Sequence, residues 1–193
     1  MLPDNTLSSE AVPAPFTGGR ALPVTDVIDY ESGGIALQDP SRGLSVQVWR
    51  ARVAHNNSAI VLDAEQVAAT TLITGNNITE VSLSFDSNMR PVVAYVDDGV
   101  AKLYWYDTQQ SAQVITEFAG AITPRVALDD KRALQSAGRD VIFAYLRGGN
   151  LYIRQQRDRY QTEYLLQASV DSPGLIKIGM NRELRFQFLL RNP

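Results

Sequence analysis

The sequence predicts an all-β fold, a propeller-like array of four-stranded antiparallel sheets, and three observations support this. A motif of short segments with alternating apolar residues recurs, with starts at residues 35, 81, 126 and 176. A period of about 40–50 residues built from short strands is typical of propeller blades. Glycines suited to tight turns lie inside the clearest copies, and helical periodicity is scarce. We therefore expect about three and a half units over residues 33–193, preceded by an extended N-terminal arm, residues 1–32.

The arm is rich in proline and glycine, which leave little room for a regular element. Proline fixes its own φ and favours extended geometry in the residue before it. The arm also carries apolar residues that we expect to act as partner-binding anchors: Val12, Phe16, Leu22, Val24, Val27, Ile28 and Tyr30. Such a segment can dock on a neighbouring subunit by strand addition. It can also lie on its own domain and close it, and both alternatives stay open.

The first unit begins at Ile35 and continues through an alternating apolar and polar stretch at residues 44–53. The cluster at residues 55–57 then predicts a turn into a strand at residues 59–62. Residues 63–69, which follow that strand, fit either a polar loop or a turn or two of helix.

The second and third units each contain a strand that ends in Ala-Tyr, a glycine turn, and a strand that carries Leu-Tyr. The turns are Asp97-Asp98-Gly99 and Arg147-Gly148-Gly149-Asn150, where glycine accepts the positive φ of a tight hairpin. One unit is thus four antiparallel strands, which in the third unit we place at residues 125–129, 140–146, 150–157 and 161–167. A last fragment has only two, at residues 175–180 and 184–190.

Three full units and one two-stranded fragment do not close a propeller by themselves. The missing strands can come from the N-terminal arm or from another chain. A strand edge with unpaired N–H and C=O groups invites pairing, so the sequence predicts assembly with other copies or with neighbouring proteins.

Composition narrows the chemistry. The chain has 193 residues, no cysteine and one histidine, His55. Thiol catalysis and thiolate metal sites need cysteine, and histidine-based catalysis and metal sites would have to rely on His55 alone. We expect no enzymatic activity, no catalytic residues, no metal and no cofactor. The absence of cysteine fits synthesis in a reducing cytoplasm, and no apolar run approaches the length of about 20 residues that a membrane span needs.

The charge is unevenly distributed along the chain. Residues 1–130 carry 7 basic and 16 acidic side chains, a balance of −9, whereas residues 131–193 carry 11 and 5, a balance of +6. Opposed halves suit head-to-tail contact between copies. Arginine dominates the basic residues, which favours protein interfaces over a loose nucleic-acid surface.

Aromatic residues offer an alternative function. Tyr95 aligns with Tyr145, and Tyr104 with Tyr152, which predicts packing positions repeated in each unit. Trp49, Trp105 and Tyr106 fall outside this match. These three residues are candidates for stacking a sugar in a carbohydrate-binding, receptor-recognition module of the β-propeller type.

Several segments resemble virion structural proteins of tailed bacteriophages. They are Ser84–Gly99, Arg147–Arg154, Arg159–Glu163 and Gly179–Phe188. The resemblance covers about residues 80–193 and has no catalytic residues to transfer. It implies a non-enzymatic subunit of the tail, connector or fibre-attachment assembly, made in the host cytoplasm, present in symmetric copies and packed against itself and other virion proteins.

Overall fold

The computed structural model describes residues 31–37, 46–64, 67–129, 140–180 and 185–191. Side chains are described from Trp49 onward. The arm anchors predicted at Val12, Phe16, Leu22, Val24, Val27, Ile28 and Tyr30 lie outside the described residues. The described part is all-β, as predicted, with a single 3₁₀ turn at Gln156–Asp158.

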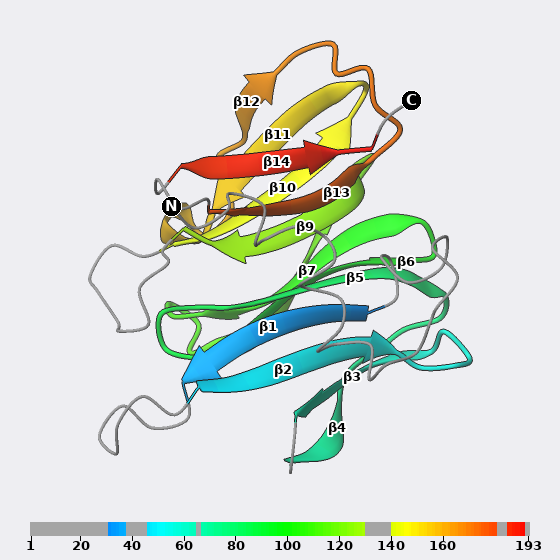
Figure 1. Cartoon of the computed structure of the whole chain (residues 1–193), viewed down its shortest axis with the longest axis vertical. Coiled ribbons are helices and arrows are strands. Elements are labelled where there is room, and N and C mark those ends of the chain that lie inside the picture. The colour runs from blue at the N-terminus through cyan, green and yellow to red at the C-terminus, as the bar shows by residue number, and fades with distance from the viewer. Residues whose placement is uncertain (1–30, 38–45, 65–66, 130–139, 181–184, 192–193) are drawn as a thin grey trace, which may run out of the picture.

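The strands form four antiparallel sheets, each built from consecutive strands (Figure 1). The first sheet contains β1 (Glu31–Leu37), β2 (Val46–Val53), β3 (Ala59–Ala64) and β4 (Val67–Thr74). The second contains β5 (Ile78–Phe85), β6 (Pro91–Asp97), β7 (Val100–Asp107) and β8 (Ala112–Phe118). The third contains β9 (Ile122–Leu128), β10 (Val141–Arg147), β11 (Asn150–Gln155) and β12 (Tyr164–Gln167). The last sheet contains β13 (Leu175–Met180) and β14 (Phe186–Leu190).

The prediction for residues 63–69 was wrong. The chain is strand up to Ala64 and again from Val67, and these two residues pair with each other. Of the polar residues that suggested a loop, Asp63 lies on β3, and residues 65 and 66 lie outside the described residues. β4 is an edge strand whose first five residues are exposed. Pairing with β3 satisfies backbone groups that a helix would have satisfied locally.

The first sheet lies at one end of the long axis of the molecule, the second sheet follows it, and the third and last sheets lie together toward the other end (Figure 1). Contacts connect their first strands in succession, β1 to β5, β5 to β9 and β9 to β13. Three hydrophobic clusters fill the spaces between neighbouring sheets. The core is therefore divided among three interfaces between sheets.

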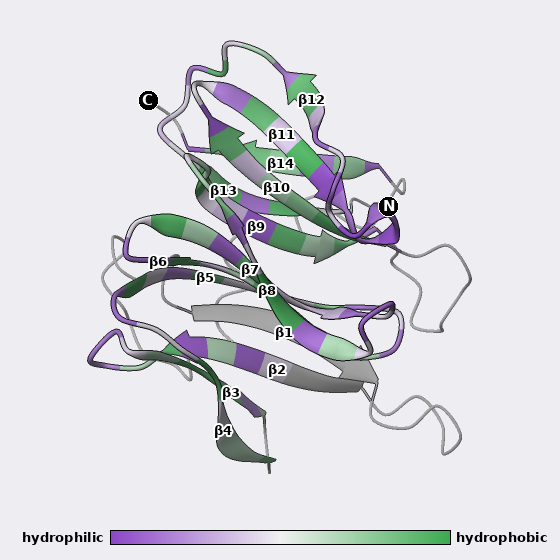
Figure 2. Cartoon of the chain, turned by 180° about the vertical axis from the view of Figure 1, so that it is seen from behind, coloured by the Kyte–Doolittle hydropathy of each residue, from purple (hydrophilic) through white to green (hydrophobic). Residues whose placement is uncertain are grey.

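The inner strands have two buried faces. On β6, Val93 and Tyr95 pack toward the first sheet, whereas Val92 and Ala94 pack toward the third. This is why β6 and β10 are continuous apolar runs, because both faces of the pleat contact another layer. β2 alternates instead, because only one of its faces packs on another sheet, as the bands of hydropathy along it show (Figure 2).

The two glycine hairpins are confirmed. Asp98 and Gly99 have φ values of 51° and 76°, and Gly148 and Gly149 have 56° and 73°. Two consecutive residues with positive φ define the type I′ turn, whose twist matches that of the strands it joins.

The hairpin registers correct one alignment from the sequence. Tyr95 and Tyr145 are equivalent, since each lies two residues before the last residue of its strand and both are buried. Across the hairpins, however, Tyr95 pairs with Lys102 and Tyr145 pairs with Tyr152. Tyr152 therefore corresponds to Lys102, and Tyr104 lies two residues farther along. The alignment of the two Leu-Tyr pairs was wrong by two residues. Such a shift is hard to detect from the sequence, because it leaves each side chain on the same face of the strand.

Candidate functional site

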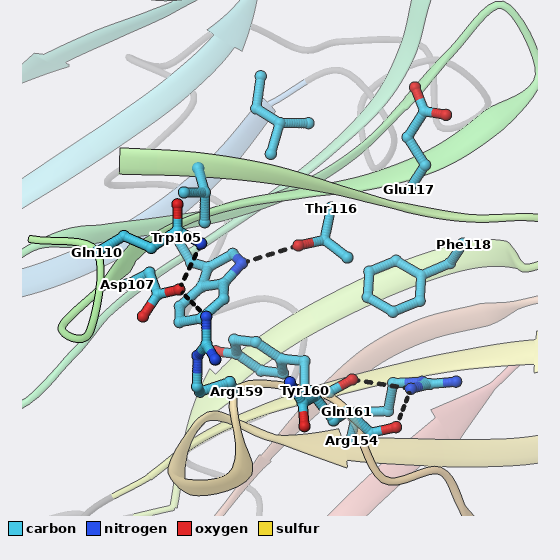
Figure 3. A pocket seen from close by; sticks show the side chains of 12 residues that line it. Trp105, Asp107, Gln110, Thr116, Glu117, Phe118, Arg154, Arg159, Tyr160 and Gln161 are labelled. Carbon is cyan, nitrogen blue, oxygen red and sulfur yellow. Dashed lines mark hydrogen bonds and ion pairs between the residues drawn. The ribbon is translucent and has the colours of Figure 1, made fainter. Parts of the chain in front are cut away.

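A groove of about 560 Å³ lies between β8 of the second sheet and the segment that connects β11 to β12 in the third (Figure 3). Its lining combines aromatic and charged residues, among them Trp105, Asp107, Phe118, Arg154, Arg159 and Tyr160. Aromatic, acidic and basic side chains from two sheets therefore meet in this groove.

Trp105 forms the inner wall of this groove. The alternation of β7 turns Leu103, Trp105 and Asp107 toward the third sheet. Trp105 is only 4% exposed, and its Nε1 donates a hydrogen bond to Thr116 Oγ1 at 3.1 Å. Its ring meets Tyr160 edge to face, with centroids 5.1 Å apart. Trp105 is therefore a core residue with a satisfied N–H.

A buried ion pair closes one side of the groove. Asp107 accepts hydrogen bonds from the Gln109 backbone N–H at 2.9 Å and from Gln110 Nε2 at 3.0 Å. It also accepts one from Arg159 Nη2, which belongs to the third sheet. The hydrogen bond from Arg159 holds the pKa of Asp107 below its ordinary value. The pair connects two sheets through an ionised carboxylate.

Arg159 and Tyr160 lie on a constrained stretch of backbone. Their φ values are 60° and 58°, in the left-handed region that non-glycine residues rarely adopt. This conformation directs the Tyr160 ring inward, between Trp105 and Phe143. The Tyr160 hydroxyl is buried and has no hydrogen-bond partner among the described residues. Burial raises its pKa well above the usual range, with Asp140 adding to the effect.

We expect Tyr160→Phe to raise the free energy of unfolding by about 1 kcal/mol, because an unsatisfied buried hydroxyl costs roughly 1–3 kcal/mol. Urea unfolding monitored by fluorescence measures this. Tyr145→Phe is the matched control, since the Tyr145 hydroxyl accepts from Arg154 Nε at 3.0 Å and donates to Glu163. That variant should lose stability. A loss of stability in Tyr160→Phe would show that the hydroxyl has a hydrogen-bond partner in solution.

Glu163 organises a second charged cluster near the rim. It accepts hydrogen bonds from Tyr145, from Arg147 and, at 3.1 Å, from Arg154 Nη2. Burial by itself would raise the pKa of Glu163, but the hydrogen bonds from Tyr145 and Arg154 and the charge of Arg147 hold it below its ordinary value. Burial raises the pKa of Tyr145 to about 12. The cluster attaches β10, β11 and residue 163 to one another.

Several carboxylates make the stability of the fold depend on pH in the acidic range. The folded-state pKa values of Asp107 and Glu163 are lowered, as is that of Asp97, where burial is outweighed by backbone N–H groups of Asn77 and Asn76 and by Lys102. The contribution of these carboxylates to the free energy of unfolding is complete above their unfolded-state pKa values of about 4. It is lost as the pH falls through their lower folded-state pKa values. Burial raises the pKa of Asp140, so this carboxyl acts in the opposite direction.

We expect the urea midpoint to be level near neutral pH and to fall steeply below about pH 4. Glu163→Gln should reduce that slope, because the amide does not take up a proton as the pH falls. Glu117→Gln, at an exposed carboxylate, serves as the control. Equal slopes in wild type and Glu163→Gln would show that Glu163 does not contribute to the acid dependence.

The predicted stacking residues are not brought together. Trp49 lies between the first and second sheets, 6.2 Å from the ring of Phe85. Trp105 is buried at the groove, and Tyr106, on the other face of β7, lies beneath the Arg90 guanidinium at 3.7 Å. Consecutive strand residues face opposite ways, so Trp105 and Tyr106 cannot share a platform. Glycan binding stays a prediction, but these three residues do not form one surface for it.

A different kind of site lies at the end of the stack formed by β12, β13 and β14, which we call the open end. On β12, three consecutive apolar residues are exposed, with Leu165 at 55%. On β14, Leu189 is 57% exposed. In the described structure β14 pairs with β13 and with no second strand. Apolar side chains beside an unpaired strand edge are typical of a surface that binds another chain.

The incomplete last sheet was predicted from the sequence, but the exposed apolar residues of β12 were not. Their signal is present in the sequence as Tyr164-Leu165-Leu166. Three consecutive apolar residues in a strand point to both faces, and an edge strand at the end of a sheet can bury only one of them against its own domain.

The described residues contain no cluster of three or more acidic or histidine side chains placed to hold a metal ion. Within the same residues, no helix has the length and apolar character needed to cross a bilayer.

Comparison with known proteins identified no similar protein. The chain matches no family model, no curated protein and no solved structure.

Proposed function

We propose that this chain is a non-enzymatic structural subunit that acts through protein–protein packing, with its sheets arranged as an incomplete propeller-like array. The observation that supports this best is the unequal size of the sheets. Three have four strands, whereas the last has two in the described structure. The exposed apolar residues of β12 belong to the third sheet, against which the missing strands of the last sheet would pack.

The order of contacts supports the propeller-like interpretation. In a propeller the first strand of each blade lies nearest the common axis, beside the first strands of its neighbours. The contacts from β1 to β5, β5 to β9 and β9 to β13 follow this pattern. The stack is open, so ring closure requires strands from outside the described sheets.

The resemblance in residues 80–193 supports the further proposal that this subunit belongs to a bacteriophage virion, in the tail, connector or fibre-attachment assembly. Its partners are then other copies of itself and neighbouring virion proteins. The opposed charges of the two halves of the sequence favour head-to-tail contact between copies.

Sedimentation velocity across a wide concentration range tests assembly. We expect oligomers that dissociate on dilution. Leu189→Lys should weaken association about tenfold, because it places a charge on the apolar surface of the open end. Ile115→Lys changes a similarly exposed residue on β8, away from the open end, and should have little effect. A chain that remains monomeric at every concentration would contradict the proposal.

The virion assignment has its own test. Mass spectrometry of purified phage particles that encode this chain should detect it in fixed stoichiometry with known tail proteins. Its absence from the particles would remove the virion assignment and leave assembly to be judged separately.

A further inference from the structure

We propose that residues Val12–Phe16 of a second copy add to the free edge of β14 as the third strand of the last sheet. The inference rests on the proposed function and names the segment that carries it out. The acceptor is the edge of β14 that no described strand occupies, beside the exposed Leu189.

The segment Val12-Pro13-Ala14-Pro15-Phe16 has the chemistry of a terminal strand. In an extended chain, alternate residues direct their N–H groups to opposite edges. Val12, Ala14 and Phe16 would direct theirs toward β14. Pro13 and Pro15, which have no N–H, would lie on the outer edge, where proline is tolerated and prevents further pairing. The strand would pair on one side and end the sheet on the other.

The side chains of the segment also fit the surface they would cover. Val12, Ala14 and Phe16 share one face of an extended strand. A third strand beside β14 would lie over β11, where Leu151 and Ile153 already face the last sheet. The third strands of other sheets make the equivalent contact, since Tyr104 of β7 packs toward the first sheet and Tyr152 of β11 toward the second.

Charge favours this pairing. Residues 1–30 carry four acidic side chains and one basic, a balance of −3. Residues 175–191, which include both strands of the last sheet, carry four basic side chains and one acidic, a balance of +3. An acidic arm on a basic sheet gains from attraction at the edge.

The charge distribution favours a second copy as the donor. The arm joins the first sheet at Glu31, in the part of the sequence with a charge balance of −9, whereas β14 lies in the part with a balance of +6. Opposed charges suit head-to-tail contact between copies, which places the first sheet of one copy next to the last sheet of its neighbour.

Photo-crosslinking identifies the strand partner. Full-length chain with benzoylphenylalanine at position 16 is mixed with isotopically heavy chain, irradiated and digested. We expect cross-linked peptides that join residue 16 of a light chain to residues 186–190 of a heavy chain. Cross-links within one chain only, or to other strands, would overturn the proposal.

A proline scan tests the hydrogen bonds. Ala14→Pro removes an N–H that would point to β14 and should weaken association at least about tenfold. Ala21→Pro makes the same change outside the proposed strand and should leave association unchanged. Oligomers insensitive to Ala14→Pro would overturn this inference and leave the proposed function standing. A chain that never associates would overturn both.

Discussion

Replacing Arg125 with methionine should lower the free energy of unfolding by about 3–5 kcal/mol, the usual cost of breaking a buried ion pair from one side. Arg125 is 4% exposed and lies on β9, between two neighbouring sheets. Its Nη1 donates to Glu80 Oε2 of the second sheet at 2.7 Å, and its Nε donates to the Ile176 carbonyl of the last sheet at 2.9 Å. One side chain thus connects three sheets.

Urea unfolding measures the loss of stability, and two further variants serve as a control and as a test of the unpaired charge. Arg52→Met removes a half-exposed arginine paired with Asp63 and should cost about 1 kcal/mol or less. Adding Glu80→Gln to Arg125→Met should restore part of the stability, because it removes the charge that the first change leaves unpaired. If Arg125→Met and Arg52→Met cost the same, the bridge between sheets contributes no more than a surface pair.

Phe143→Ala should also cost about 3–5 kcal/mol, since it leaves a cavity in the cluster between the second and third sheets. Phe143 is fully buried on β10. Its ring lies 4.6 Å from that of Phe118, 5.1 Å from Tyr145 and 6.4 Å from Tyr160. Truncation therefore removes contacts to both sheets at once.

The control for this prediction is Phe143→Leu, which keeps most of the volume and should cost roughly 1–1.5 kcal/mol. Both variants are compared by urea unfolding at neutral pH. A loss of less than about 1 kcal/mol for Phe143→Ala would indicate that the sheets move together to fill the cavity.

Much of the fold was predictable because its elements are local. Each sheet uses consecutive strands, so a repeat with a period of about 45 residues describes both sequence and structure. The I′ turns at Asp98-Gly99 and Gly148-Gly149 follow from turn chemistry alone. The strands at residues 63–64 and 67–69 were harder to predict, because a short segment that mixes polar residues with alanines shows no clear alternation.

The candidate sites were less predictable. Trp105 looked like a stacking residue because it falls outside the repeated tyrosine positions, yet it fills the space between two sheets. Asp107 and Tyr160 gave no signal, since a single aspartate after a strand and a tyrosine after an arginine are common. Their importance depends on what the next sheet places opposite them.

The sequence by itself determined most of the strands, the glycine turns and the unequal number of strands per sheet, because these depend on alternation and backbone preference over a few residues. Only the tertiary structure decided which side chains connect the sheets. Arg125 bonds residues 45 and 51 positions away, and Asp107 meets Arg159 at a separation of 52, each about one repeat apart. A repeat places such residues on neighbouring layers, but packing of the layers decides which of them are close enough to bond.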